Sequence, residues 1–188
     1  MQSEELLQIT EALLMATSEP LTKARFRQSV EYEDIELEDV IERLQARFVE
    51  QERPVEIVFV AGGYQLVTRS EYQPFIERLF QKSGRLTLTR AALETLAMVA
   101  YRQPVTKVEI DQLRGVNSDS VLRTLLEKEL VTITGREETV GRPLLYSTTQ
   151  HFLEAFGLGT LSDMPKLKEI KEIMGDSGSA VPVANAPE

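Results

Sequence analysis

The side chains best suited to catalysis or metal binding are scarce in this sequence. It contains one histidine, His151, and no cysteine, so thiolate chemistry and a Cys-based zinc site lack their residues, and a Ser-His-Asp arrangement would have to use His151. A metal site would need carboxylates, alone or with His151, and the spacings of a His-Glu-x-x-His site or an EF-hand are absent from the sequence. We interpret His151 as a helix-start or surface residue, and we expect no catalytic residue, no metal and no cofactor.

Two other features have structural interpretations. A run of carboxylates is typical of a solvated loop followed by a helix start, where negative charge favours the helix dipole. This run comprises Glu31, Glu33, Asp34, Glu36, Glu38 and Asp39. Gly62-Gly63 lacks the surrounding motif of a phosphate-binding loop, so we interpret it as part of a turn.

The net charge of −9 is distributed unevenly along the 188 residues. Residues 1–80 hold 8 Lys and Arg against 16 Asp and Glu, whereas residues 81–188 hold 13 against 14. An acidic first half repels phosphate backbones and weighs against nucleic-acid binding. The acidic start lacks a signal-peptide pattern and no apolar run is long enough to span a membrane, so we expect a cytoplasmic protein without membrane attachment.

Residues 86–149 have the clearest pattern, which predicts three helices followed by a hairpin. The first helix has Thr89 as its N-cap and ends at Gln103-Pro104, because proline has no amide hydrogen to continue it. Thr106 and Glu109 then form a capping box at the start of the second helix.

Gly115 is suited to the end of the second helix, and Asn117 or Ser118 is suited to cap the third. Residues 130–134 and 143–148 are predicted to pair as strands. This order of helices, turn and hairpin is that of a winged-helix domain.

The first third of the chain repeats this plan at a constant offset of 84 residues, since Pro20-Leu21-Thr22-Lys23 matches Pro104-Val105-Thr106-Lys107. We therefore predict an α+β, mainly helical fold of two tandem winged-helix domains, residues 1–82 and 83–165. A short helix and a disordered C-terminal tail are expected in residues 166–188.

Helix-turn-helix domains commonly read DNA through basic or amide side chains on the third helix. Both predicted third helices, residues 36–50 and 118–129, are net negative. Arg136 and Arg142 would let the second hairpin touch a minor groove, or Arg142 with Pro143 sets the strand entry. We expect direct nucleic-acid binding to be weak or absent.

The helix that contains residues 93–101 is apolar nearly all round, more than a surface helix needs. Either it is central to the core of its domain or it also meets a partner. The first domain has a similar apolar excess at Leu6, Leu7, Leu14 and Met15, which suits dimerisation or capture of an amphipathic helix.

Three long runs of sequence resemble one family: VAGGYQLVTRSEYQPFIERL, AALETLAMVAYRQPVTKVEIDQLRGVNSDSVLRTLLEKELV and GRPLLYSTTQHFLEAFGLGTLSDMPKL. They are similar to segregation and condensation protein B, ScpB, the accessory subunit of the bacterial SMC condensin. The resemblance covers roughly residues 1–167. It implies two winged-helix domains, a homodimer made largely by the first, and no enzymatic activity.

The resemblance further implies binding to the kleisin ScpA, which bridges the heads of the SMC ATPase. It implies a role in chromosome condensation and partition, hence in the cell cycle and cell division, with association to the nucleoid through SMC. The alternative is a winged-helix DNA-binding transcriptional regulator, whose complex would weaken steeply as salt rises.

On this resemblance we expect the kleisin to contact the second domain. For two of the expected contact residues a structural role is the alternative: Asn117 as a helix cap and Tyr146 as a core residue. The expected contacts are Tyr101, Arg114, Val116, Asn117, Arg123, Arg142 and Tyr146. The expected dimer interface is Leu6, Leu7, Leu14 and Met15.

Overall fold

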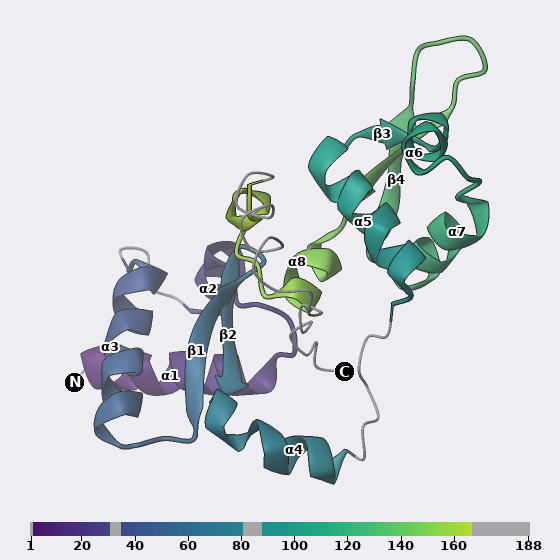
Figure 1. Cartoon of the computed structure of the whole chain (residues 1–188). Coiled ribbons are helices and arrows are strands. Elements are labelled where there is room, and N and C mark those ends of the chain that lie inside the picture. Colours follow the sequence, from purple (N-terminus) through teal and green to yellow (C-terminus); the bar gives the residue numbers. More distant parts are fainter. Residues whose placement is uncertain (1, 31–34, 81–87, 167–188) are drawn as a thin grey trace. The chain divides into compact units, whose positions relative to one another are not determined.

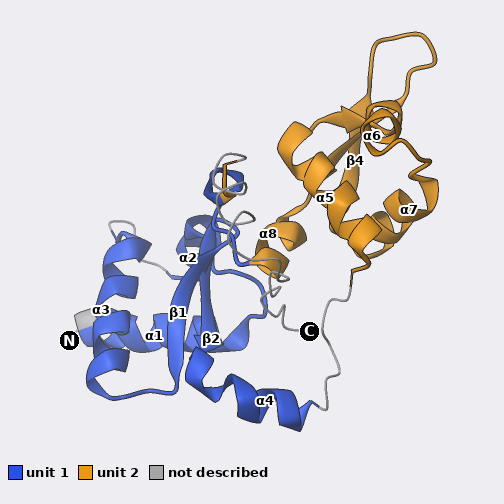
Figure 2. Ribbon diagram, in the orientation of Figure 1, with its two compact units in different colours: residues 1–85, 157–163, 186–188 blue, residues 86–156, 164–185 orange. Residues whose placement is uncertain are grey.

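The computed structural model describes residues 2–30, 35–80 and 88–166, which divide into two compact units (Figure 2). Unit 1 contains the described residues up to 80 together with Gly157–Asp163, and unit 2 contains residues 88–156 and 164–166. The sequence-based division placed residues 157–163 in the second domain, whereas they belong to unit 1. The helix and tail expected after residue 166 lie outside the described residues.

Unit 1 places helices against a two-stranded antiparallel sheet (Figure 1). Its main-chain elements are α1 (Gln2–Ala16), α2 (Lys23–Ser29), α3 (Leu37–Glu50), β1 (Val55–Val60), β2 (Gly63–Thr68), the 3-10 turn η1 (Ser70–Tyr72) and α4 (Gln73–Leu79). Val60 pairs with Gly63, so Ala61 and Gly62 form the turn of the hairpin, both with positive φ. The predicted turn is thus confirmed, with Gly63 as the first residue of β2.

The core of unit 1 lies between α1, α3 and the sheet. Val40, Ile41, Leu44 and Phe48 recur at the spacing of one helical face in α3, and all four are buried. They pack in one cluster with Leu6, Leu7 and Leu14 of α1 and with Phe26 of α2. The amphipathic period of α3 therefore predicted its buried face correctly.

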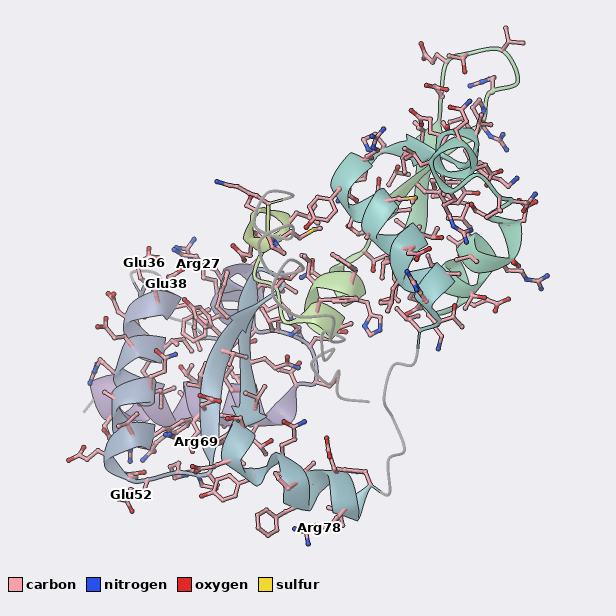
Figure 3. The ribbon with its side chains drawn as sticks, viewed as in Figure 1. Arg27, Glu36, Glu38, Glu52, Arg69 and Arg78 are labelled. Atoms are coloured by element: carbon pink, nitrogen blue, oxygen red, sulfur yellow. The ribbon has the colours of Figure 1, made fainter. Side chains whose placement is uncertain are left out.

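The acidic run beside α3 has a structural role in its described part. Glu36 forms ion pairs with Lys23 and Arg27 of α2, and Glu38 lies 3.5 Å from Lys23. Figure 3 shows Arg27, Glu36 and Glu38 together at this end of the unit. The side-chain hydrogen bond from Lys23 lowers the pKa of Glu36. These solvent-exposed ion pairs connect α2 to the start of α3.

Unit 2 combines helices with a three-stranded sheet in the order β3–β5–β4. Its elements are α5 (Arg90–Arg102), β3 (Val105–Thr106), α6 (Lys107–Arg114), α7 (Asp119–Glu127), β4 (Val131–Arg136), β5 (Leu144–Thr148) and α8 (Gln150–Phe156). The sequence predicted a hairpin alone. Val105 and Thr106 add a third strand because they pair with Tyr146 and Leu145 of β5.

The same arrangement recurs in unit 1. Leu21, which stands 84 residues before Val105, forms an antiparallel bridge with Tyr64 of β2. Two backbone hydrogen bonds of 2.7 and 3.1 Å close this bridge. Both units thus have the order helix, short extended segment, helix, helix, hairpin, which supports the internal repeat.

Candidate interaction surface

The second helix of unit 2, α6, begins and ends as its sequence predicts. The Thr106 hydroxyl accepts a hydrogen bond from the Glu109 amide at 3.3 Å, and the Glu109 carboxylate accepts one from the Thr106 amide at 2.8 Å. The Glu109 carboxylate accepts from the Thr106 amide and also from the Thr106 hydroxyl, and these two hydrogen bonds, the amide first, lower the pKa of Glu109. At the other end Gly115 adopts the left-handed conformation, with φ 71°, and its amide donates to the Asp111 carbonyl.

A polar network holds the turn from α6 to α7. The Asp111 carboxylate accepts from the Ser118 amide at 2.8 Å, and the Lys107 ammonium lies 2.9 Å from Asp111 and 3.1 Å from Asp119. Hydrogen bonding by Ser118 and then by Lys107 holds the pKa of Asp111 below its ordinary value. One cation therefore bridges a carboxylate of each helix.

Asn117 supplies the side-chain cap of α7. Its carbonyl oxygen accepts from the Asp119 amide at 2.8 Å, and its amide group donates to the Asp119 carboxylate at 3.0 Å. Ser118 occupies the N-cap position, but its hydroxyl is buried and accepts from the Arg114 guanidinium at 3.3 Å. Of the two residues that the sequence left open, Ser118 thus has the N-cap position, while the side-chain hydrogen bond to the first helical amide comes from Asn117.

Apolar side chains are exposed around this polar network. Val108 and Leu113 on α6, and Val116 just after it, keep 56%, 44% and 57% of their surface. We call these three residues together with Arg114 the α6 surface. Exposed apolar residues grouped on one short helix and its turn are typical of a protein-binding surface.

Comparisons of the whole sequence with known proteins show the family to which the chain belongs. Residues 8–167, which extend across both units, match the model of the family described as segregation and condensation complex subunit ScpB. The chain belongs to the ScpB family. A relative from Desulforamulus reducens called segregation and condensation protein B is 48% identical over 162 residues, 85% of this chain and 87% of that protein.

A second protein of that name, from Clostridium tetani, is 41% identical over 164 residues, 87% of each chain. Among solved structures, the crystal structure of ScpB from Mycobacterium tuberculosis is 34% identical, with a TM-score of 0.40, and covers 84% of this chain and 98% of its own. The family match over residues 8–167 extends over nearly the whole described chain.

Four of the residues expected from the ScpB resemblance lie together. Arg114, Val116 and Asn117 surround the α6–α7 turn. Tyr146 lies behind it in β5, where it is 7% exposed, and burial followed by the charge of Asp119 raises its pKa. Tyr146 is thus a core residue beside the network, the structural alternative that the sequence kept open.

The other three expected residues lie elsewhere in unit 2. The Tyr101 hydroxyl donates to the Pro165 carbonyl at 2.5 Å, which ties α5 to the chain beyond α8. Arg123 of α7 is paired with Glu127 one turn later at 2.9 Å. Arg142 lies in the loop between β4 and β5, where its carbonyl accepts from Arg136. Sequence reasoning missed Val108 and Leu113. Both are apolar residues that α6 leaves exposed.

The residues expected at a dimer interface are placed differently. Leu6, Leu7 and Leu14 are buried in the core of their own unit, whereas Met15 is 66% exposed. Only Met15 of this set is therefore available on the surface of unit 1. A larger apolar area, which we call the α4 face, was missed by sequence reasoning: Tyr72, Phe75, Leu79 and Phe80, exposed at 38%, 64%, 75% and 58%.

Two further findings concern the described residues as a whole. Within residues 2–30, 35–80 and 88–166, no group of three or more His, Cys, Asp or Glu side chains is arranged to hold a metal ion. None of the helices in this described part of the chain is long and apolar enough to cross a membrane.

Proposed function

We propose that this chain is a non-enzymatic accessory subunit of a bacterial SMC condensin, binding the kleisin ScpA and acting in chromosome condensation and segregation. The observation that carries the proposal is the ScpB family match over residues 8–167. Each unit is then a winged-helix domain, consistent with its order of helices and hairpin. The subunit would act in the cytoplasm, at the nucleoid, through SMC.

The α6 surface is our proposed docking site for a helical segment of the kleisin. Val108, Leu113 and Val116 offer apolar contacts, and Arg114 is a donor at their edge. An amphipathic helix binds such a surface by burying its apolar face. The ion pairs of Lys107 with Asp111 and Asp119 hold α6 and α7 together beneath it.

The alternative, a DNA-binding regulator, has weaker support. Arg123, the arginine of α7, is paired with Glu127 in the same helix, so its charge is offset beside the position where bases would lie. The acidic first half adds repulsion toward phosphate. We therefore place protein binding ahead of DNA binding.

The test is a titration of ScpA into the full chain and into the Val116→Asp variant. A charge in the middle of an apolar contact should weaken binding at least about tenfold, because the carboxylate is desolvated without a partner. The matched control is Val140→Asp in the β4–β5 loop, since Val140 is fully exposed in the same unit. Val116→Asp binding ScpA as tightly as the wild type would remove the α6 surface from the proposal.

Salt separates the two functions in the same experiment. A complex formed by apolar contacts should persist between 50 and about 200 mM salt, whereas a phosphate-dominated DNA complex loses orders of magnitude in affinity over that range. Tight, salt-sensitive duplex binding in the absence of ScpA binding would favour the regulator.

A further inference from the structure

The segment Gly157–Asp163 docks on the hairpin turn of unit 1. The Leu158 carbonyl accepts from the Ala61 amide at 2.8 Å, and the Gly159 carbonyl accepts from the Gly62 amide at 2.9 Å. The segment follows α8 directly, although α8 belongs to unit 2. Neither the ScpB resemblance nor the α6 surface accounts for this contact.

The turn has two amide donors to offer. In the β1–β2 register Val60 pairs with Gly63, so the ladder does not engage the amides of the two intervening residues. Ala61 and Gly62 both have positive φ, at 51° and 74°, the conformation of a tight two-residue hairpin turn. Successive amides that donate to successive carbonyls form a small site of backbone donors.

Gly159 fits this site because it has no side chain. A Cβ atom there would lie 2.7 Å from Cδ1 and 2.9 Å from Cε1 of the Phe59 ring. Gly159 is buried and its φ lies outside the positive range, so space rather than backbone conformation requires glycine. Such close approach of a backbone to an aromatic ring is a recognised reason for glycine.

The bend after Gly159 is held by its own hydrogen bonds. The Asp163 carboxylate accepts from the Thr160 amide at 2.8 Å, and the Asp163 amide donates to the Thr160 carbonyl at 3.1 Å. These bonds enclose the 3-10 turn η2 (Leu161–Asp163). The docked segment therefore has a defined conformation of its own.

We infer that Ala61, Gly62 and the Phe59 ring form a binding site for a glycine-containing peptide segment, and that residues 157–163 of this chain are its ligand. The ligand segment follows α8 in the chain without an intervening residue, since α8 ends at Phe156.

The test uses the full chain and the variant Gly159→Ala, which places a methyl group against Phe59. Hydrogen exchange of the Ala61 and Gly62 amides, followed by NMR, should become at least tenfold faster when the segment is displaced. The matched control is Gly135→Ala in β4, where a Cβ meets nothing within 4 Å, and it should leave these exchange rates unchanged.

A second variant avoids the steric clash altogether. Asp163→Ala removes the carboxylate that accepts from Thr160 and should also accelerate exchange at Ala61 and Gly62. In Phe59→Ala/Gly159→Ala the ring no longer meets the added methyl group, whereas Oδ2 of Asp163 still lies 2.9 Å from the methyl position, so protection should recover only in part relative to Gly159→Ala. Wild-type exchange rates in both Gly159→Ala and Asp163→Ala would overturn the inference, as would equal acceleration in Gly135→Ala.

Discussion

Asp111 joins the end of α6 to the start of α7, since its carboxylate accepts from the Ser118 amide and pairs with Lys107. Its lowered pKa means that the folded chain holds the ionised form more strongly than the unfolded chain does. This contribution to stability is present above the ordinary aspartate pKa, about 3.9, and is lost as pH falls through the lowered pKa.

Replacing Asp111 by Asn should therefore lower the free energy of unfolding of unit 2 by about 1 kcal/mol at pH 7, because the amide oxygen still accepts from Ser118 but lacks the charge facing Lys107. The difference from the wild type should shrink as the pH is lowered. Urea unfolding followed by NMR signals of unit 2, at neutral and acid pH, measures both effects.

Glu127→Gln is the matched control, since it neutralises an exposed carboxylate in an ion pair one turn apart on α7. Exposed pairs of this kind contribute about 0.5 kcal/mol or less. A deficit of Asp111→Asn that stays constant into acid would show that the lost stability does not come from the carboxylate charge.

The stability of α6 depends on the hydrogen bonds at its two ends. It has eight residues, of which Ile110 is buried, so its apolar packing is limited. Its capping box satisfies amide groups that the helix itself leaves without partners. The capping residue, Thr106, is also the second residue of β3, which connects the start of α6 to β5.

Thr106→Val keeps the branched shape that suits β3 and removes the hydroxyl acceptor. We expect a loss of about 1 kcal/mol in the stability of unit 2, the usual cost of an N-cap. Thermal unfolding measures it, with Thr132→Val on the exposed side of β4 as control. A Thr106→Val protein as stable as that control would mean that water replaces the hydroxyl without cost.

For the whole molecule, the α4 face is the largest unexplained feature of unit 1. None of the seven residues of α4 is buried, and helices this short are unstable in water by themselves. The Arg78 guanidinium, labelled in Figure 3, lies 5.0 Å from the centroid of the Phe75 ring, and both side chains are exposed. We propose that a second copy of this chain covers the face and stabilises α4 in a homodimer.

Light scattering tests this interface. The wild-type chain should have about twice the monomer mass of 21.2 kDa. The double variant Phe75→Asp/Leu79→Asp should have the mass of a single monomer. Met15→Asp is the informative comparison, because Met15 is the exposed residue of the interface expected from the sequence. A monomer produced by Met15→Asp, with the α4 variant still dimeric, would move the interface to α1.

Local features were predictable because they depend on neighbouring residues. The inward stripe of α3 follows from helical period, and the Thr106 capping box and the Gly115 cap follow from side chains within one turn of their targets. The α6–α7 turn was recognised for the same reason. The sequence by itself thus determined the start and end of α6 and the turn that follows it.

Tertiary structure decided what distant segments do to one another. Val105 and Thr106 become a strand only because β5 lies beside them. The need for glycine at position 159 likewise follows only from the Phe59 ring that packs against it. Within α1, Leu14 and Met15 are consecutive apolar residues, and packing buries the first and leaves the second exposed. The apolar period shows which face of a helix is apolar, whereas the folded chain decides whether its own core or another surface covers that face.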